Sequence, residues 1–535
     1  MPKYGEDMLG YIFTNLQTKE KSRTIHGEVI KKNIQGVASL IENGVNPNLQ
    51  DEEGKTPLHI IALYDDDVNI AIAKLLLKKG ADPNLEDQKG RVPLHIAARR
   101  QNPQMVDVLL ASEKTEVDLQ DNRRCTPLFE AVGPGLYFYG KKENIEKDED
   151  FYRLDTFGDE AEHIVKALLF HGADPNFQDE DGNTPLHIVA FAHPREINIA
   201  IVKLLLDDSA DPNSRNEKGD TPLHFLARTC YPEISEMVQL LLEKGADPNL
   251  KNEEGEAPLH TAAFSENVIM VSILLESEKT NVNLPAECGW TPLFFAIECE
   301  DAGTTERIEE IRTALLQHGA SLNYQDENGN TPLHIAVWMN ELEAIEIFIK
   351  FGAEVNRQNK EGKTPLHIAV EERAIDIVKD LIDCGADVNI ECNEGRPPFY
   401  LAAVGCFSSD YQGNRPRDRC SFDMVKIFLD KEDAIDWKDE GYRKEIWDNV
   451  RDEKIKELLI PIFQCRTIWD LWEMEKTEFN SYIQWVPQEI VEETAWSFFK
   501  RNQSLKRKRI DEEAACENPK RFCQELENFS YSPSP

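Results

Sequence analysis

Short apolar runs recur along the chain in pairs, and the same residue types mark where each pair begins and ends. A first helix is predicted over residues such as 57–62, where Pro presets φ at the first helical position and the preceding Thr caps the helix. A second apolar stripe follows at 72–77, and Gly80 is predicted to end it in the left-handed conformation. Turn-forming residues then lead to the next Pro. The pattern predicts repeated helix–turn–helix units.

The signature Thr-Pro-Leu-His, or a close variant of it, occurs ten times. Its prolines are Pro57, Pro93, Pro127, Pro185, Pro222, Pro258, Pro292, Pro332, Pro365 and Pro398. The first three prolines lie 165 residues before the fifth, sixth and seventh, and Phe129 and Phe294 replace the signature histidine at matching places. This periodicity indicates one repeat array, built from a duplicated four-repeat cassette and two further units, rather than several globular domains.

The motifs TPLHIA, LLLxxGADPN and DxxGxTPLH, together at a step of about 33 residues, resemble those of the ankyrin-repeat family. The resemblance covers roughly residues 26–400, with a degenerate continuation to about 463. It implies an all-α solenoid of stacked helix–turn–helix units with short β-hairpin or turn fingers, a small helical C-terminal cap, and a concave protein-binding face.

This reading divides the chain into five parts. They are N-terminal capping helices with a first degenerate repeat (1–49), ankyrin repeats (50–403), degenerate terminal repeats (404–463), a Trp-rich helical module (464–503) and a disordered basic and polar tail (504–535). Six of the eight tryptophans follow residue 436, where the signature has stopped, so the composition changes at the point where the array ends.

Two interpretations of the Trp-rich module stay open. It is a helical cap on the last repeat, or it recruits a partner. Val486, Pro487, Glu489 and Ile490 resemble the start of the F-box-like module that follows ankyrin arrays in poxviral, wasp and endosymbiont proteins, with Val in place of the usual Leu. That resemblance implies binding to subunits of a cullin-type ubiquitin ligase.

The charge restricts the class of partner. With 98 Asp and Glu against 60 Lys and Arg, the net charge is −38, which argues against nucleic-acid binding and favours a protein partner with a basic face. Basic residues gather instead in the tail, at Lys506, Arg507, Lys508, Arg509, Lys520 and Arg521. These two clusters predict a bipartite nuclear import signal and therefore binding to import receptors; a solvated tail is the alternative.

Two places in the array are candidate contacts with a partner. Tyr137, Phe138 and Tyr139 lie in an insertion between the two helices of one repeat, where an aromatic cluster on a charged loop is typical of a binding anchor. A solvated insertion is the alternative. Trp290 occupies a finger position that faces the partner in ankyrin proteins, or it packs against the adjacent finger.

The rest of the sequence contains no recognisable catalytic or metal-binding motif. Seven of the twelve histidines hold the fourth place of the signature, which predicts a structural role, and the others lack metal-ligand spacing. Phosphate-binding loops, nucleophile elbows and kinase motifs are absent from the sequence. We therefore expect no enzyme activity, no catalytic residue, no cofactor and no metal.

The compartment is predicted from what the sequence lacks. The eleven cysteines form no Cys-x-x-Cys pair, which is typical of reduced cysteines, and the first residues have no apolar core of a signal peptide. No stretch of about eighteen apolar residues predicts a membrane span. The predicted location is cytoplasmic, nuclear or both.

The leading functional hypothesis is a non-enzymatic scaffold that binds a protein on its concave ankyrin surface. One alternative is a substrate adaptor of a cullin-type ubiquitin ligase. Another is a nuclear regulator resembling inhibitor of kappa B, or an effector of an intracellular microbe that acts in the host cytosol or nucleus.

Overall fold

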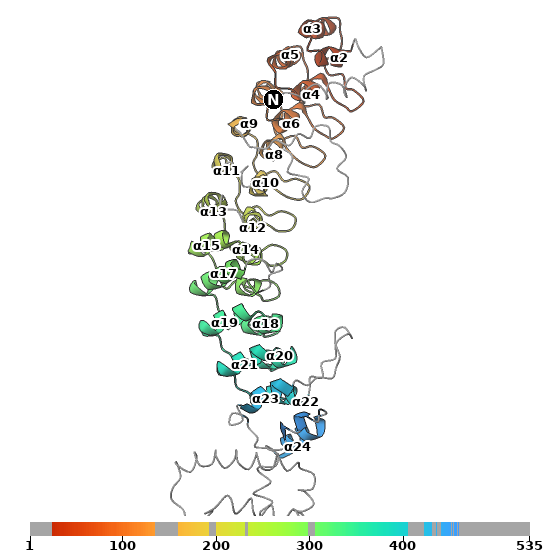
Figure 1. Ribbon diagram of the computed structural model, residues 1–535. Helices are drawn as coiled ribbons and strands as arrows, with labels where there is room; N and C mark the ends of the chain where they lie inside the picture. Colours follow the sequence, from red (N-terminus) through yellow and green to blue (C-terminus); the bar gives the residue numbers. More distant parts are fainter. Residues whose placement is uncertain are drawn as a thin grey trace, which may run out of the picture. The chain divides into compact units, whose positions relative to one another are not determined.

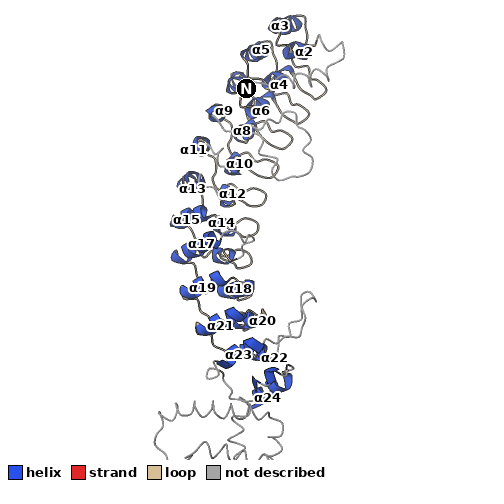
Figure 2. Cartoon of the chain, viewed as in Figure 1, coloured by secondary structure: helices blue, strands red, loops and turns tan. Residues whose placement is uncertain are grey.

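The computed structural model describes residues 24–133, 159–191, 199–229, 234–297, 305–404, 422–430 and 440–450, with residue 435 and six positions between 452 and 459. These residues form helices, turns and loops and contain no strand (Figure 2). The prediction of an all-α repeat class is confirmed. The chain falls into two compact units, Met1–Glu354 and Val355–Pro535, each of which is described by itself.

In the first unit each repeat contributes two helices, and we call the helix that opens a repeat the inner helix and the one that closes it the outer helix. The inner helices are α2 (Ile25–Ile30), α4 (Pro57–Ala62), α6 (Pro93–Arg99), α8 (Pro127–Val132), α10 (Pro185–Phe191), α12 (Pro222–Ala227), α14 (Pro258–Phe264), α16 (Pro292–Phe295) and α18 (Pro332–Met339). The outer helices are α3 (Ile34–Glu42), α5 (Asp67–Lys78), α7 (Pro103–Leu110), α9 (Asp159–Phe170), α11 (Ile199–Asp207), α13 (Ile234–Glu243), α15 (Val268–Glu276), α17 (Thr305–Gln317) and α19 (Leu342–Lys350).

The two kinds of helix form two rows within this unit. Each inner helix packs on the next inner helix and on the outer helix of its own repeat, and the outer helices pack on one another in the same order (Figure 1). The fingers project from the row of inner helices, on the side away from the outer helices (Figure 1). The repeats therefore place the fingers and the inner helices along one face.

The sequence explains why the rows pack closely. Inner helices present small side chains such as Ala97 and Ala98, and outer helices supply larger ones such as Leu76 and Leu109; all four are fully buried. Each repeat thus buries its apolar faces only against its neighbours, and the core continues from one repeat to the next.

Two helix ends confirm the predicted role of glycine in ending the outer helices. Gly80 follows α5 with φ +90°, in the left-handed region that a glycine adopts without strain. Ser209 takes the same place after α11 and adopts φ +71°, although its side chain disfavours that conformation. The backbone geometry of the repeat is therefore kept even where the glycine is lost.

The second unit contains α20 (Pro365–Glu371), α21 (Ile375–Asp383), α22 (Pro398–Val404), α23 (Phe422–Asp430) and α24 (Glu440–Asn449). Helix α20 packs on α21 and α22, and α22 packs on α23 and α24. Phe399 and Phe428 are fully buried and meet edge to face with ring centroids 5.9 Å apart. The degenerate signature at Pro398 therefore still opens a packed inner helix.

The insertion that contains Tyr137 falls where the sequence predicts it, between the two helices of one repeat, and two further insertions occupy the same place in other repeats. Residues 134–158 separate α8 from α9, residues 298–304 separate α16 from α17, and residues 405–421 separate α22 from α23. These insertions lie outside the described residues, and so do Tyr137, Phe138 and Tyr139.

Candidate functional site

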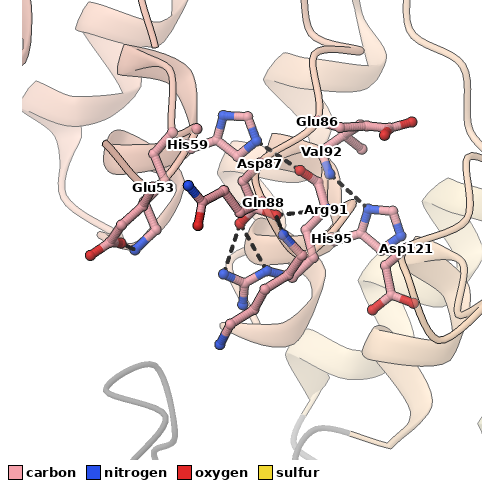
Figure 3. Close-up of polar contacts among 12 residues, drawn as sticks. Glu53, His59, Glu86, Asp87, Gln88, Arg91, Val92, His95 and Asp121 are labelled. Atoms are coloured by element: carbon pink, nitrogen blue, oxygen red, sulfur yellow. Dashed lines mark hydrogen bonds and ion pairs between the residues drawn. The ribbon is translucent and has the colours of Figure 1, made fainter. Parts of the chain in front are cut away.

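A buried histidine joins one repeat to the next. Nδ1 of His59 accepts hydrogen bonds from the backbone N–H of Thr56 at 3.0 Å and from its hydroxyl at 2.8 Å. Nε2 of His59 donates to the carbonyl oxygen of Arg91, at 2.8 Å, in the finger of the next repeat (Figure 3). Since one ring nitrogen accepts and the other donates, the imidazole is neutral.

The same bridge recurs along the array, which confirms the structural role predicted for the signature histidines. Nε2 donates to the next finger's carbonyl in the pairs His95–Cys125 (2.9 Å), His187–Asp220 (3.0 Å), His224–Glu256 (3.0 Å) and His260–Trp290 (3.3 Å), and in the second unit His367–Arg396 (3.1 Å). Sequence reasoning missed His26, whose Nε2 donates to the carbonyl of Lys55 at 3.0 Å. The cap residue Thr24, two positions before it, was the available signal.

Burial fixes the charge of these imidazoles. It lowers the pKa of His59, His187, His224 and His260 from 6.5 to about 4, and it also lowers the pKa of His95. The bridges are therefore neutral hydrogen bonds at neutral pH and present no charge to a ligand.

Each finger is closed by its own hydrogen bonds. The backbone N–H of Asp87 donates to the carbonyl of Arg91 at 2.8 Å, and Oδ1 of Asp87 accepts from the backbone N–H of Arg91 at 2.9 Å. Their side chains form a buried ion pair at 2.8 Å (Figure 3). Burial alone would raise the pKa of Asp87, but the Arg91 guanidinium holds it below the ordinary value.

Neighbouring fingers are bonded at their tips. The backbone N–H of Gln88 donates to the carbonyl of Glu53 at 3.0 Å. Gly54, with φ +77°, allows this approach, because a Cβ there would lie 2.9 Å from the Gln88 nitrogen. Equivalent bonds join Asn122 to Lys89, Glu180 to Arg123, Glu217 to Asp181 and Glu253 to Lys218.

A ladder of asparagines joins the turns that follow the outer helices. Asn48 Oδ1 accepts from the backbone N–H of Asp82 at 2.7 Å, and Asn213 Oδ1 accepts from that of Asp247 at 2.7 Å. The sequence predicted only turns here, although the recurring Asn of GADPN was the signal. Backbone groups of the finger tips and of the turns after the outer helices therefore form hydrogen bonds with neighbouring repeats.

In the first unit two repeats have phenylalanine in place of the bridging histidine. Phe129 and Phe294 are fully buried at the histidine position, and the buried hydroxyls of Thr126 and Thr291 have no hydrogen-bond partner. A phenyl ring offers no donor to the next finger and no acceptor to the cap. The two junctions at matching places of the duplicated cassettes therefore lack one of the bonds between repeats.

Trp290 lies half-buried against its own helix and the adjacent finger. Its ring stacks on Phe294 with centroids 5.7 Å apart and meets Phe295 edge to face at 5.9 Å. Its Nε1 donates to Oδ2 of Asp326 in the next finger at 3.4 Å. The structure thus shows the contact with the adjacent finger.

The other candidate residues lie outside the described part of the chain. These are Tyr137, Phe138 and Tyr139 in the insertion, Val486, Pro487, Glu489 and Ile490 in the Trp-rich module, and Lys506, Arg507, Lys508, Arg509, Lys520 and Arg521 in the tail. Their roles stay predictions.

Within the described residues no group of three or more His, Cys, Asp or Glu side chains is arranged to hold a metal ion. None of the helices described above has the length and apolar content that crossing a membrane requires.

The comparisons with known proteins identify the class. The family described as "Ankyrin repeats (3 copies)" matches residues 25–121, 66–136, 157–252, 231–326 and 306–392, which together make up more than half of the chain. The chain therefore belongs to the ankyrin-repeat family. Ankyrin repeats are modules that bind other proteins, so the chain is a protein–protein interaction scaffold.

Individual relatives share only segments with this chain. Human SH3 and multiple ankyrin repeat domains protein 2 is 31% identical over 187 residues, 33% of this chain and 10% of the relative. Putative ankyrin repeat protein YahD of Escherichia coli K12 is 42% identical over 67 residues, 12% of this chain and 32% of the relative. The chain thus spans a third or less of these relatives' own lengths. The ankyrin repeat domain of Bcl-3, a member of the IkappaB protein family, aligns along its whole length with 47% of this chain at 25% identity and a TM-score of 0.38.

The Thr hydroxyls provide a matched test of the bridge. In Thr221→Val the hydroxyl that bonds His224 Nδ1 at 2.9 Å is lost, and we expect the free energy of unfolding to fall by about 1 kcal/mol. In Thr291→Val the lost hydroxyl has no partner, so stability should stay the same or rise. Urea unfolding followed by circular dichroism measures both variants. Val92 caps α6, so valine itself is tolerated at the cap position. Equal losses in the two variants would therefore contradict the account, because they could not come from the hydrogen bond to histidine.

The pKa values predict how stability depends on pH. Below about pH 6.5 the unfolded chain binds protons at these histidines, whereas folded His59, His187, His224 and His260 bind them only near pH 4. The unfolded state therefore binds more protons, and the free energy of unfolding falls as the pH drops from 6.5 toward 4. We expect imidazole nitrogen NMR signals of the folded chain to show neutral rings at pH 5.5, with the urea-unfolded chain as control. Protonation of these rings near pH 6.5 in the folded chain would refute the neutral bridge.

Proposed function

We propose that the chain holds its protein partner against the inner helices and fingers of the unit Met1–Glu354, and that it recognises a basic surface on that partner. The observation that carries the proposal is the charge of the exposed finger tips between residues 180 and 328. Those tips consist of Glu180, Asp181, Glu217, Lys218, Glu253, Glu254, Glu287, Cys288, Glu327 and Asn328, all exposed. Seven of these ten side chains are acidic and one is basic.

The groups that hold the repeats together are separate from the side chains left exposed for a partner, and this supports the proposed function. We call the first set, the bonded backbone groups and bridging histidines, the frame. The backbone groups that link the fingers, and the histidines that bridge them, are engaged within the array, so they need no partner to become ordered. A preformed surface loses little conformational entropy on binding. Acidic tips that point into solvent speed association with a basic partner and oppose association with an acidic one. Binding of this kind requires no catalytic residue, and we propose that the scaffold is non-enzymatic.

Two finer proposals rest on the sequence of the C-terminal region. The segment Val486–Ile490 supports recruitment of a cullin-type ubiquitin ligase, which would make the partner on the array a substrate. The basic clusters within 506–521 support import into the nucleus. Both proposals are compatible with a protein-binding array.

Charge reversal at the tips tests the main proposal. The full chain is used for proximity labelling in cells, and the partner most enriched by it is purified. We expect the triple variant Glu217→Lys, Glu253→Lys and Glu287→Lys to bind that partner about tenfold more weakly in low salt, with a smaller difference at high salt. Binding is measured by calorimetry or surface plasmon resonance.

The control is a second triple variant with the same change of charge on outer helices. Glu243, Glu276 and Glu310 are exposed residues of α13, α15 and α17, so Glu243→Lys, Glu276→Lys and Glu310→Lys alter the net charge equally. The proposal requires binding close to that of the unmodified chain. An equal loss of affinity in both triple variants would show that binding responds to net charge rather than to the tips. No loss in either variant would contradict recognition by the tips.

Two deletions in an epitope-tagged full chain test the C-terminal proposals. Removing residues 465–503 should eliminate cullin-ligase subunits from affinity-purified material, and their absence from the undeleted chain as well would remove the adaptor proposal. Removing residues 504–521 from a fluorescent fusion should abolish its nuclear signal. A fusion of the undeleted chain that stays outside the nucleus would refute import.

A further inference from the structure

Three large aromatic side chains are exposed at the same place of three inner helices. Phe191, Phe264 and Trp338 each lie six residues after the signature proline, at the C-terminal ends of α10, α14 and α18. Their side chains are 44%, 41% and 55% exposed. Single exposed apolar residues are ordinary on a protein surface, but three at one structural position of a stacked row form a line.

Two half-buried rings belong to the intervening repeats, Phe225 in α12 and Trp290 just before α16. Phe225 in α12 meets Phe191 edge to face with centroids 6.1 Å apart, and the guanidinium of Arg228 lies 6.0 Å from the Phe225 ring centroid. Trp290 meets the buried ring of Phe295 edge to face with centroids 5.9 Å apart. We call the exposed and half-buried rings the aromatic belt: Phe191, Phe225, Phe264, Trp290 and Trp338. The belt runs along consecutive inner helices from α10 to α18, which pack one on the next.

A carboxylate in the same repeats as the belt forms no direct ion pair. Glu256 precedes α14 in the finger that accepts the His224 bridge, and its side chain is half-buried. Within the described residues Glu256 forms no ion pair, whereas Asp220, at the same place of the preceding finger, pairs with Arg228 at 2.7 Å. Burial raises the pKa of Glu256 and nearby Glu254 raises it further, while Arg228 and Thr261 act in the opposite direction without cancelling the rise. A carboxylate that is partly removed from water and forms no direct ion pair costs free energy, and a ligand cation in contact with it would recover part of that cost.

We propose that the aromatic belt and Glu256 form the docking surface for one segment of the partner protein, which places apolar side chains on the rings and a Lys or Arg on the Glu256 carboxylate. The inference rests on the proposed function. It restricts the binding surface to the five repeats from α10 to α18 and the partner segment to one that is apolar and basic. Inner helices at the usual spacing of about 8–10 Å place Phe191 and Trp338 about 30–40 Å apart. An extended segment of about ten to twelve residues covers that length.

The charges of the same repeats select among possible occupants. Glu253, Glu254 and Glu287 at the finger tips repel nucleic acid and acidic peptides, and they attract a segment whose apolar residues are flanked by Lys or Arg. A second copy of the chain would bring the same acidic tips against each other across a symmetric contact. The basic apolar segment of a different protein is therefore the occupant that fits.

A random 12-residue peptide library displayed on phage, selected on the full chain, tests the docking surface. We expect the enriched peptides to combine aromatic or large aliphatic residues with Lys or Arg. Synthetic copies should bind the double variant Phe264→Ala and Trp338→Ala about tenfold more weakly or worse, because exposed aromatic anchors carry much of the binding energy. They should bind Glu256→Gln several-fold more weakly. Fluorescence polarisation measures each dissociation constant.

The matched control is the double variant Phe170→Ala and Phe351→Ala. These phenylalanines are 87% and 41% exposed at the ends of the outer helices α9 and α19, so the control removes the same kind of surface elsewhere. Its binding should equal that of the unmodified chain. All four substituted side chains are partly exposed, so both double variants should stay folded with only a modest decrease in their urea midpoints.

Several results overturn the inference. They are the enrichment of no peptide, the enrichment of acidic or purely polar peptides, and equal effects of belt and control variants. Peptides that ignore the belt variants but respond to charge reversal at the tips would overturn the belt and leave the proposed function standing. Sedimentation that shows a dimer for the unmodified chain and a monomer for Phe264→Ala with Trp338→Ala would assign the belt to a second copy and reject a foreign segment.

Discussion

The neutral histidine between the N-cap of one repeat and the finger carbonyl of the next is the contact on which the rest of the array depends. It accepts from the cap backbone through Nδ1 and donates through Nε2, as His59 does between Thr56 and Arg91. A single side chain thereby fixes the start of an inner helix and the position of the neighbouring finger. Because both ring nitrogens are occupied in a buried site, protonation would break the contact, and burial keeps the ring neutral.

This arrangement separates stability from recognition. Histidine bridges, tip-to-tip backbone bonds and the asparagine ladder engage the polar groups of the frame within the array. The side chains left exposed on the inner helices and finger tips are then free to differ between repeats at little cost to folding. In the repeats from α10 to α18 they include the aromatic belt and seven acidic tip residues, which form a surface suited to an apolar and basic partner.

Much of the frame could be predicted from the sequence because its signals are local. Proline opens a helix and glycine closes one through their own backbone preferences, so Pro57 and Gly80 mark their elements directly. Contacts between repeats are less visible, since they join residues about 30 positions apart. His26 was missed because it lies outside the signature, and the asparagine ladder because one sequence shows only that Asn favours turns.

The binding surface was harder to predict for a different physical reason. The position six residues after the signature proline holds different residue types in different repeats, for example Arg228 and Leu63, so the repeat pattern does not mark it. The exposure of Phe191, Phe264 and Trp338 there follows only from the packing of neighbouring helices. For Trp290 the sequence left two interpretations open, and the bond to Asp326 shows the contact with the adjacent finger. The insertions, the Trp-rich module and the tail carry predictions that the described residues do not test.

Native-state hydrogen exchange along the first unit tests the central claim most directly. If the histidine bridge couples neighbouring repeats, amides of the inner helices that carry it, such as α4 and α12, should exchange slowly and to similar extents. Amides of α8 and α16, where Phe129 and Phe294 replace the histidine, should exchange faster than those of the helices on either side. Uniform protection across these helices, or the lowest protection in α4 or α12, would contradict the account.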